Sequence, residues 1–369
     1  MSQLKVAVIG AGHLGRIHTR LLSSIKLVEL VAVADPSVQA CQNIEEEFGV
    51  RTVADYQSLI PEIDAAVIAT PTRFHFEITA NLLENQIHCL VEKPLTDSVA
   101  DATQLVKLAE ENNCVVSVGH CERYNAATKT ALKEVGTPKF VQTSRQSGYT
   151  FRSTDIGVVH DLMIHDIDLV NSMFPGNIVD VRATGISVFG KNEDIAQARL
   201  EFSCGGVANL TASRCSFAPE RRIQIFGTEG FATANLADQS IESVRVPAWV
   251  RERGFDFHSI TPEQQAFIRE NLFSNVLPKD RKEVESNNAI LAEQKDWIEA
   301  IKCEIQPRVT VQHGKEAVEI AQFILDYIGR HRWSDYGEPL KGALATPHVK
   351  PDAVPMPSIL VDQPVRKAA

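Results

Sequence analysis

The 369-residue sequence lacks the features that mark exported or membrane proteins. No uninterrupted apolar run approaches the roughly 20 residues that a membrane helix needs. The first stretch, MSQLKVAVIG, enters a strand pattern directly, without the charged and then apolar leader of a signal peptide. The seven cysteines are odd in number and scattered, and no C-x-x-C pair occurs, which is typical of reduced thiols. We therefore expect a soluble, cytoplasmic protein with no membrane segment.

Positive charge is also scarce, because 37 Lys and Arg residues stand against 47 Asp and Glu residues. The formal net charge of −10 argues against non-specific binding to nucleic acid or to an anionic membrane, but is compatible with a local basic pocket for a small anion. The hydrophobic content of 44% and the charged content of 23% are ordinary for a globular protein. Since a chain of this length exceeds the usual size of one hydrophobic core, we expect two domains.

Two patterns of apolar residues divide the chain. From residue 4 to about 120, short β-rich runs alternate with helical patterns, which predicts a parallel sheet covered by helices. After about 125, longer alternating runs predict a largely antiparallel sheet with one covered face. Residues 286–331 have helical spacing and are expected to pack at the domain junction, and six prolines in the last 36 residues predict an extended C-terminal arm. The expected divisions are 1–122, 123–333 and 334–369.

A glycine-rich loop, VAVIGAGHLGRIH, follows the first predicted strand. It places Gly10, Gly12 and Gly15 as G-x-G-x-x-G, where a tight turn, the approach of a pyrophosphate and helix–strand packing each need a glycine. The following helix N-terminus offers free N–H groups to phosphate. The alternative is an ordinary glycine-rich turn, but the second strand ends in Asp35, where a carboxylate can bind the adenosine ribose hydroxyls. No arginine follows Asp35 to bind a 2′-phosphate, so NAD is expected rather than NADP.

The fold class is therefore α/β, with an N-terminal Rossmann dinucleotide-binding domain and a C-terminal α/β domain that has an open, mostly antiparallel sheet. In a Rossmann sheet, ligands bind beyond the carboxyl ends of the strands. The motif VEKP places Glu92 and Lys93 at one of these ends. Lys93 is therefore a candidate for chemistry at the cofactor, and a solvated surface lysine is the alternative.

The segment HDLMIHDIDLV, residues 160–170, carries two histidines and three aspartates among large apolar residues. On an α-helix, Asp161, His165 and Asp168 share one face, and His160 lies off it. The five-residue spacing of the histidines is poor for joint metal binding, so no metal is expected. A carboxylate one turn from a histidine makes a better acid/base pair, because the carboxylate can orient the ring. A buried histidine with a purely structural role is the remaining alternative.

Together these motifs resemble the Gfo/Idh/MocA oxidoreductase family. The resemblance rests on GAGHLG, Asp35, ATPT with His75 shortly after, EKP, VGHCERYN and the D-x-x-x-H of DLMIHDID, in that order. In that family a Rossmann domain binds a nicotinamide cofactor, and a second α/β domain contacts the substrate and usually forms the oligomer interface. The resemblance therefore implies a homo-oligomer, a dimer or tetramer, and catalytic roles for Lys93, Asp161 and His165.

The resemblance also implies which residues contact each ligand. The expected cofactor-binding residues are Gly10, Gly12, His13, Leu14, Gly15, Asp35, Thr70, Pro71, His75, Glu92, Lys93 and His120. The expected substrate-binding residues are Arg123, Tyr124, Asn125, Asp161 and His165. The EKP motif further implies a cis peptide bond between Lys93 and Pro94.

Two motifs are similar to one branch of the family. VGHCERYNAA and DIGVVHDLMIHDIDLV look like the branch that acts on the 3-hydroxyl of UDP-N-acetylglucosamine, which typically carries VGH-x-ERFNPA and GVV-x-DLMIHDID. This chain departs from that pattern at Tyr124 and Ala126. A UDP-sugar carries a diphosphate, and arginine side chains bind phosphate groups well. Several arginines of the second domain are therefore candidate partners, and the alternative is that they are ordinary surface residues. These are Arg123, Arg145, Arg152, Arg214, Arg221 and Arg222.

The expected reaction is NAD-dependent oxidation of a secondary sugar alcohol. His165, held by Asp161, is expected to remove the hydroxyl proton while hydride moves to the cofactor, and Lys93 polarises or deprotonates the same oxygen. Which of the two is the formal base stays open. One alternative is a dehydrogenase of a cyclic polyol or free sugar, of the inositol or glucose type. The other is a non-enzymatic NAD-responsive sensor, against which the joint presence of the three residues argues.

Overall fold

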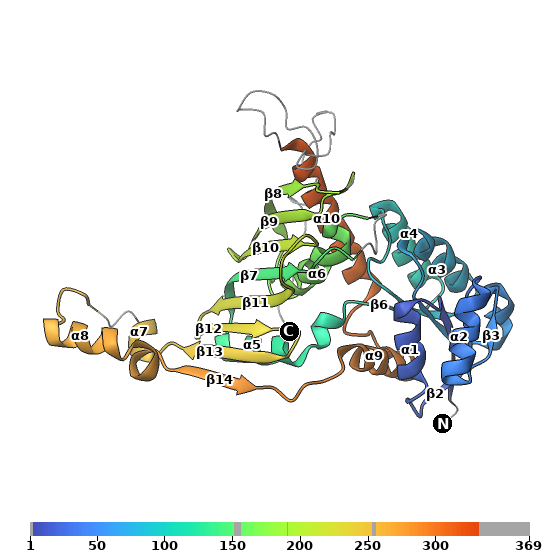
Figure 1. Cartoon of the computed structure of the whole chain (residues 1–369), viewed down its shortest axis with the longest axis horizontal. Helices are drawn as coiled ribbons and strands as arrows, with labels where there is room; N and C mark the ends of the chain where they lie inside the picture. The colour runs from blue at the N-terminus through green and yellow to red at the C-terminus, as the bar shows by residue number, and fades with distance from the viewer. Residues whose placement is uncertain (1–2, 151–155, 190, 253–255, 332–369) are drawn as a thin grey trace. The chain divides into compact units, whose positions relative to one another are not determined.

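The computed structural model describes residues 3–150, 156–189, 191–252 and 256–331 (Figure 1). Contacts divide the chain into two compact units. The first unit contains Met1–Tyr124 and Asn288–Gln322, and the second contains Asn125–Asn287 and Phe323–Ala369.

The expected domain boundaries stay a prediction. The expected second domain contains all of 123–333, whereas contacts group Asn288–Gln322 with the first unit. The expected C-terminal arm, residues 334–369, lies outside the described residues.

The first unit is built on a six-stranded parallel sheet with the strand order β3-β2-β1-β4-β5-β6. Helices α1 and α2 pack on β2, α3 packs on β5, and α9 packs on α1. The strands are β1 (Leu4–Ile9), β2 (Val28–Ala34), β3 (Thr52–Val53), β4 (Ala65–Ile68), β5 (His88–Val91) and β6 (Val116–Val118). The helices are α1 (His13–Leu22), α2 (Val38–Phe48), α3 (His75–Glu84), α4 (Val99–Glu111) and α9 (Ala289–Cys303), with short turns η1 (Tyr56–Glu62), η2 (Thr72–Phe74) and η3 (Cys121–Tyr124).

The central strands of this sheet are buried on both faces. All four residues of β4 are buried, and β1 has one exposed residue, as expected for parallel strands with helices on either side. Trp297 from α9 is fully buried in the same core as Leu22, Val67 and Leu90. The late helix therefore completes the core of the first unit, although it is far away in the sequence.

The second unit is built on an eight-stranded sheet with the order β14-β13-β12-β11-β7-β10-β9-β8. All neighbouring strands are antiparallel except β7 and β10, which are parallel. The strands are β7 (Pro138–Gln146), β8 (Ile178–Ile186), β9 (Ile195–Phe202), β10 (Val207–Ser213), β11 (Glu220–Gly227), β12 (Gly230–Asn235), β13 (Ser240–Arg245) and β14 (Lys279–Glu283). The helices are α5 (Ala126–Val135), the π-helical η4 (Val159–Met163), α6 (Ile164–Asn171), α7 (Ala248–Arg251), α8 (Pro262–Glu270) and the π-helical η5 (Leu272–Val276), and α10 (Val311–Arg330) ends in this unit.

One face of the second sheet is covered. Helix α5 packs on β11, β12 and β13, while η4 and α6 pack on β7 and β10 (Figure 1). Buried and less buried residues alternate along β9, as a sheet with one covered face requires. The expected α/β class, with a parallel Rossmann sheet followed by a mostly antiparallel sheet, is therefore confirmed.

No helix among the described residues is long and apolar enough to cross a membrane.

Candidate active-site residues

The loop between β1 and α1 has the shape that a dinucleotide phosphate needs. Gly10 has a φ of +106°, and a Cβ at this position would collide with the carbonyl group of Ala69. A Cβ on Gly15 would collide with the carbonyl oxygen of Gly10, so helix and strand approach closely here. At Gly12, by contrast, a Cβ would meet no atom of the described residues within 4 Å, and none of their side chains caps the helix N-terminus. The loop therefore leaves an open edge of backbone N–H groups for a phosphate.

Asp35 is held at the end of β2 by backbone groups. Its Oδ2 accepts a hydrogen bond from the N–H of Ala11 at 2.8 Å, and its Oδ1 accepts one from the N–H of Ser37 at 2.8 Å. The side chain is half-buried, so these two bonds fix the carboxylate without enclosing it. A fixed carboxylate one strand away from the phosphate loop fits the ribose of NAD.

His75 joins two backbone segments beyond the ends of β4 and β5. Its Nδ1 lies 2.8 Å from the carbonyl oxygen of Pro94, and its Nε2 lies 2.9 Å from the carbonyl oxygen of Thr70. A neutral ring can donate to only one of these oxygens. Burial lowers the pKa of His75, although both carbonyl groups favour the protonated ring. The residue is 1% exposed, so the ring is enclosed by the protein, and its two nitrogens face backbone oxygens.

Thr70 offers a polar atom that the protein itself does not satisfy. Within the described part of the chain, its Oγ1 is buried and has no hydrogen-bond partner. Buried hydroxyl groups are normally hydrogen-bonded, so an unsatisfied one beside the Rossmann crevice fits a ligand contact. Pro71 is exposed next to it, and His13 and Leu14 lie at the start of α1, exposed and half-buried. His120, after β6, is buried.

Glu92 belongs to a buried polar chain that no sequence motif predicts. Its Oε1 lies 2.8 Å from Nε2 of His18 on α1, and Nδ1 of His18 lies 2.8 Å from the side-chain nitrogen of Gln294 on α9. Because an amide nitrogen can only donate, Nδ1 accepts and Nε2 carries the proton that is donated to Glu92. Burial by itself raises the pKa of Glu92, but the hydrogen bond from His18 and the positive charge of Lys93 oppose it, and the pKa is lowered.

Lys93 follows this carboxylate directly. Its backbone N–H donates to Oε2 of Glu92 at 3.2 Å, and the peptide bond to Pro94 is cis, which confirms the expected bond geometry. The side chain is half-buried at the carboxyl end of β5. Glu92 thus ties the backbone of Lys93 to the core of the first unit through His18.

In the second unit, the helix that carries His165 starts differently from the expected α-helix. Asp161 lies in the π-helical turn η4, and His165 lies in the first turn of α6. A π-turn widens the spacing of side chains, so the expected shared face does not follow from α-helical geometry here. Asp161 and His165 are half-buried, whereas Asp168 and His160 are buried, at 1% and 8% exposure. Such π-turns within helices are frequent at functional sites.

Two buried contacts hold this helix in place. Arg145 on β7 binds Asp166 with Nη2 to Oδ1 at 2.9 Å, and the two side chains are 4% and 3% exposed. Oε1 of Glu193 accepts a hydrogen bond from the N–H of Val159 at 3.0 Å, at the start of η4. Burial raises the pKa of Glu193, and the hydrogen bond from Val159 opposes this effect. The residue next to His165 is therefore anchored to the sheet.

The residues expected to bind substrate from VGHCERYN are largely engaged within the protein. The hydroxyl group of Tyr124 donates to Oδ2 of Asp296 at 2.8 Å, and its side chain is 2% exposed. Asn125 caps α5, and its Nδ2 donates to the carbonyl oxygen of Leu236 at 3.0 Å. Arg123 is half-buried. Direct contact of Tyr124, Asn125 and Arg123 with substrate stays a prediction.

The candidate arginines for a diphosphate fall into different environments. Arg145 and Arg214 are buried in ion pairs, the latter with Asp194 at 2.6 Å. Arg222 pairs with Glu220 at 3.1 Å, and Arg221 is exposed. Arg152 lies outside the described residues. Arg145 and Arg214 therefore have structural partners already, which makes them poor candidates for a ligand contact.

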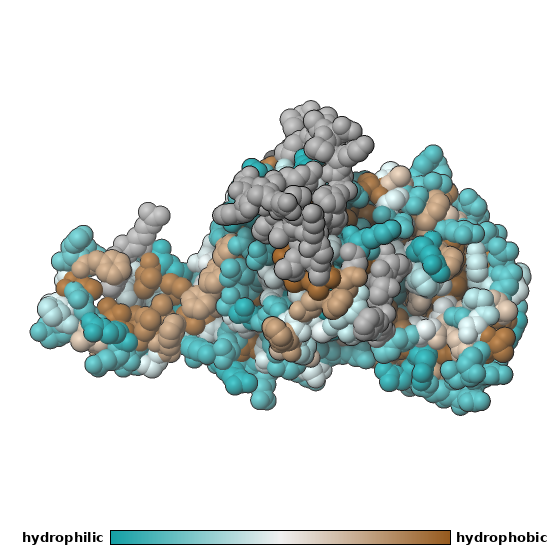
Figure 2. All heavy atoms as spheres, turned by 45° about the horizontal axis from the view of Figure 1, so that its top comes forward, coloured by the Kyte–Doolittle hydropathy of each residue, from teal (hydrophilic) through white to brown (hydrophobic). Residues whose placement is uncertain are grey.

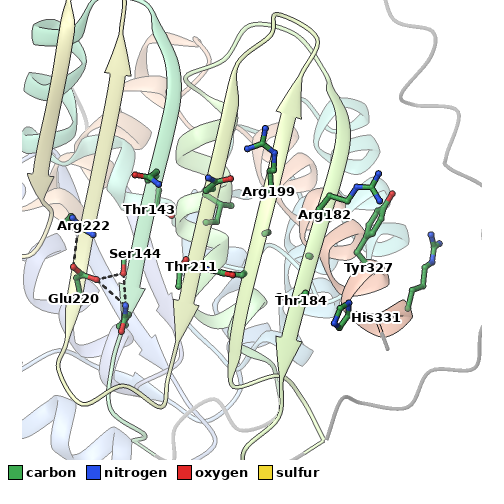
Figure 3. Close-up of a pocket in the computed structure, with 18 residues that line it drawn as sticks. Thr143, Ser144, Arg182, Thr184, Arg199, Thr211, Glu220, Arg222, Tyr327 and His331 are labelled. Carbon is green, nitrogen blue, oxygen red and sulfur yellow. Dashed lines mark hydrogen bonds and ion pairs between the residues drawn. The ribbon is translucent and has the colours of Figure 1, made fainter. Parts of the chain in front are cut away.

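A polar pocket of 840 Å³ lies on the open face of the second sheet (Figure 3). Ser144 and Gln146 line it, while Arg145 between them on β7 points to the opposite face, where α6 lies. Polar side chains from five strands point into the pocket, among them Arg182 and Arg199. Tyr327 and His331, at the end of the described residues, also line it. None of the expected catalytic residues lines this pocket.

The described residues contain no group of three or more His, Cys, Asp or Glu side chains that could hold a metal ion.

Comparisons with known proteins relate both units to one family. A family pattern described as "Oxidoreductase family, NAD-binding Rossmann fold" matches residues 4–120, and one described as "GFO/IDH/MocA C-terminal domain" matches residues 131–233. The UDP-N-acetylglucosamine 3-dehydrogenase of Acidithiobacillus ferrooxidans is 34% identical over 242 residues, which are 65% of this chain and 77% of that protein. The scyllo-inositol 2-dehydrogenase (NAD(+)) of Bacillus subtilis is 28% identical over 249 residues, which are 62% of this chain and 72% of that protein.

Among solved structures, the UDP-N-acetylglucosamine 3-dehydrogenase GnnA from Acidithiobacillus ferrooxidans has a TM-score of 0.76 and 27% identity. The match covers 89% of this chain and 98% of that one.

Proposed function

The chain belongs to the Gfo/Idh/MocA family of oxidoreductases with an NAD-binding Rossmann domain, and from this we propose that it oxidises the 3-hydroxyl of UDP-N-acetylglucosamine, or of a related nucleotide sugar. The observation that carries the proposal is the match to a UDP-N-acetylglucosamine 3-dehydrogenase along both units, over 98% of that enzyme's structure. The motifs VGHCERYNAA and GVVHDLMIHDID support the same substrate class.

The residues present fit NAD. Gly10, Gly12 and Gly15 would hold the phosphates, Asp35 would bind the ribose hydroxyls, and Thr70 has an unsatisfied hydroxyl group nearby in the fold. Bound NAD supplies the hydride acceptor for alcohol oxidation. The remaining expected contacts, from His13, Leu14, Pro71, His75, Glu92 and His120, belong to this proposal as well, although both ring nitrogens of His75 already lie within 2.9 Å of backbone oxygens.

We assign proton removal to His165. An imidazole titrates near neutral pH, so it can accept the hydroxyl proton of the substrate, and the carboxylate of Asp161 stabilises the charged ring. Lys93 stabilises the alkoxide with its positive charge. The ion pair of Arg145 with Asp166 and the bond from Val159 to Glu193 position the helix that carries His165. This proton transfer contributes roughly 10²–10⁴-fold to the rate.

The test is a substrate panel with NAD as the acceptor. The full chain is incubated with UDP-N-acetylglucosamine, other UDP-sugars, free N-acetylglucosamine, glucose and myo-inositol, and absorbance of reduced cofactor is followed. We expect turnover with UDP-N-acetylglucosamine and inhibition by UDP that competes with the sugar substrate. Turnover of free sugars or inositol alone, without competition by UDP, would refute the UDP-linked substrate.

A cyclic polyol is the second candidate substrate. Several relatives are inositol dehydrogenases, including the scyllo-inositol 2-dehydrogenase of Bacillus subtilis at 28% identity. Free inositol carries no phosphate, so its oxidation would be insensitive to UDP. The same panel therefore separates the two candidates.

We also propose that the protein is cytoplasmic and forms a homo-oligomer, a dimer or tetramer. All seven cysteines lie within the described residues and none of them forms a disulfide, which suits a reducing compartment. A subunit of 40.7 kDa makes each assembly distinguishable by mass.

A further inference from the structure

A helical segment interrupts the hairpin formed by β13 and β14. We call residues 246–278 the insertion; it contains α7, α8 and η5. The strands on either side of it pair with each other, from Val244 opposite Lys279 to Ser240 opposite Glu283. Figure 1 shows that the insertion extends away from the sheet of its own unit, beyond the ends of β13 and β14.

The insertion is specified by local sequence signals. Thr261 and Gln264 form a reciprocal capping box at the start of α8, and Pro262 occupies the first turn. These signals favour a helix start at this point, because they satisfy backbone N–H groups that the first turn leaves unpaired. A nine-residue helix is nevertheless marginal in water unless one of its faces packs against other groups.

The helices of the insertion that the structure describes do not bury a core of their own. None of the side chains of α7, α8 and η5 is buried. Phe267 and Phe273 are 55% and 51% exposed, and Trp249 and Phe257 are 46% and 75% exposed. Figure 2 shows apolar residues gathered over this part of the molecule. Since soluble proteins rarely expose clustered aromatic side chains, and since interfaces are enriched in them, this surface has the composition of an interface.

The charge of the insertion indicates the kind of partner. Residues 248–276 carry three arginines, no lysine and four carboxylates, a net charge of −1 in a chain of net charge −10. A surface that binds an anionic membrane or nucleic acid needs a cluster of Lys and Arg, which is absent from this stretch of sequence. The partner is therefore another protein surface, and the insertion of a second copy offers the same exposed aromatic side chains without a strong opposing charge.

The exposed apolar area of the insertion is large enough for a specific interface between two copies. The four aromatic side chains offer on the order of 100 Å² each at their exposure, given ~150–250 Å² for a fully exposed ring. Two copies of the insertion, with their aliphatic neighbours, therefore supply on the order of 1,000 Å², the lower bound for a specific interface. Strand β14 does not compete for this role: its sequence KDRKE is charged throughout, which disfavours pairing with another strand at that edge of the sheet.

We propose that α8 and η5 of the insertion pack against a second copy of this chain through Phe267 and Phe273. The contact removes these rings from water and supplies the packing that α8 and η5 need to remain helical. This inference rests on the proposed homo-oligomer and is independent of the proposed reaction.

The experiment measures the molar mass of the full chain by size-exclusion chromatography with light scattering. Wild-type protein is expected at a multiple of 40.7 kDa. The double variant Phe267→Glu with Phe273→Glu is expected to elute at a smaller multiple, because a buried carboxylate is costly. The matched control, Gln265→Glu with Ser274→Glu, adds the same charge at exposed positions of the same two helices and is expected to keep the wild-type mass.

Each other outcome overturns the inference. A monomeric wild-type chain would remove the second copy, and an unchanged mass of the Phe267/Phe273 variant would place the interface elsewhere. Equal dissociation of the control would mean that added charge, and not the aromatic rings, is responsible. If a chain ending at residue 331 dissociates while the Phe267/Phe273 variant does not, the C-terminal residues form the interface instead. Circular dichroism of the variant confirms that the subunit stays folded, and its NADH formation with the substrate panel reports on the proposed function separately.

Discussion

Asp35 is the residue that sets the choice between NAD and NADP in this account. Two backbone N–H groups fix its carboxylate at the end of β2, where it binds a free ribose diol and repels a 2′-phosphate. We expect Asp35→Ala to weaken NAD binding more than NADP binding, so that the ratio of the two dissociation constants shifts toward NADP. Titration of both cofactors by fluorescence checks this. Tighter binding of NADP than of NAD by the unmodified chain would contradict the assignment.

Residues of the cofactor loop were predictable from the sequence because their requirements are local. Gly10 adopts a positive φ, which favours glycine. Asp35 is separated from the glycine loop by one helix and one strand, which is the spacing that the dinucleotide-binding motif requires. The chain from Glu92 through His18 to Gln294 was not predictable, because Gln294 is 276 residues away from His18. The one available signal was His18 itself, a polar residue on the helix face that packs against the sheet.

At the scale of elements, the ion pair of Arg145 and Asp166 is expected to dominate the stability of the α6 region. Both partners are almost fully buried, so Asp166→Ala leaves a buried arginine without its counter-ion. We expect this change to lower the free energy of unfolding by about 3–5 kcal/mol. Chemical denaturation checks it.

The exposed pair of Arg199 and Glu201 is the matched control on β9. Its side chains are 45% and 40% exposed, so Glu201→Ala is expected to cost less than about 1 kcal/mol. The double change of Arg145→Met with Asp166→Leu is expected to cost less than Asp166→Ala alone, because no buried charge remains. A small effect of Asp166→Ala would show that the pair does not anchor the helix.

The helix of His165 illustrates what periodicity can and cannot predict. Large apolar residues around 160–170 indicated a packed helix, and the structure has one. The π-turn at Val159–Met163 was not predictable, because it depends on distant contacts such as the bond from Val159 to Glu193. The same limit applies to the second sheet, where alternation predicted antiparallel strands but not that β7 and β10 run parallel.

For the whole molecule, two histidines and one glutamate predict how stability depends on pH. Burial lowers the pKa of His75 below its ordinary value of 6.5, and burial does the same to His88. The unfolded chain then binds more protons than the folded chain, so this stability is complete above pH 6.5 and is lost as pH falls toward the folded pKa. Glu92, whose pKa is lowered from 4.5, adds a second loss of stability that begins at lower pH.

Denaturation at pH 8 and at pH 5.5 measures the first of these windows. We expect the free energy of unfolding to be lower at pH 5.5, and His75→Gln to reduce the difference between the two values. His258→Gln, at an exposed position, is the control and should leave the difference unchanged. Equal stability of the unmodified chain at the two pH values would contradict the role of His75 and His88.

At this scale the sequence pattern anticipated both sheets and their order, because each sheet type leaves its own alternation of apolar residues. The grouping of Asn288–Gln322 with the first unit was not anticipated, since helical spacing shows that a face is buried but not against what. Trp297 illustrates this limit. Its position on the apolar helix face predicts that it is buried, but does not predict that it packs in the core of the first unit.

The most direct test of the account is the steady-state rate of NADH formation from NAD and UDP-N-acetylglucosamine, measured for the unmodified chain and for His165→Ala. We predict turnover by the unmodified chain, and a kcat lower by roughly 10²–10⁴-fold in His165→Ala with NAD affinity unchanged, because the ring acts on the substrate oxygen. Lys93→Ala should be similarly damaging, and His160→Ala far milder. An unmodified chain that forms no NADH with this substrate, or a His165→Ala variant that keeps its rate, would contradict it.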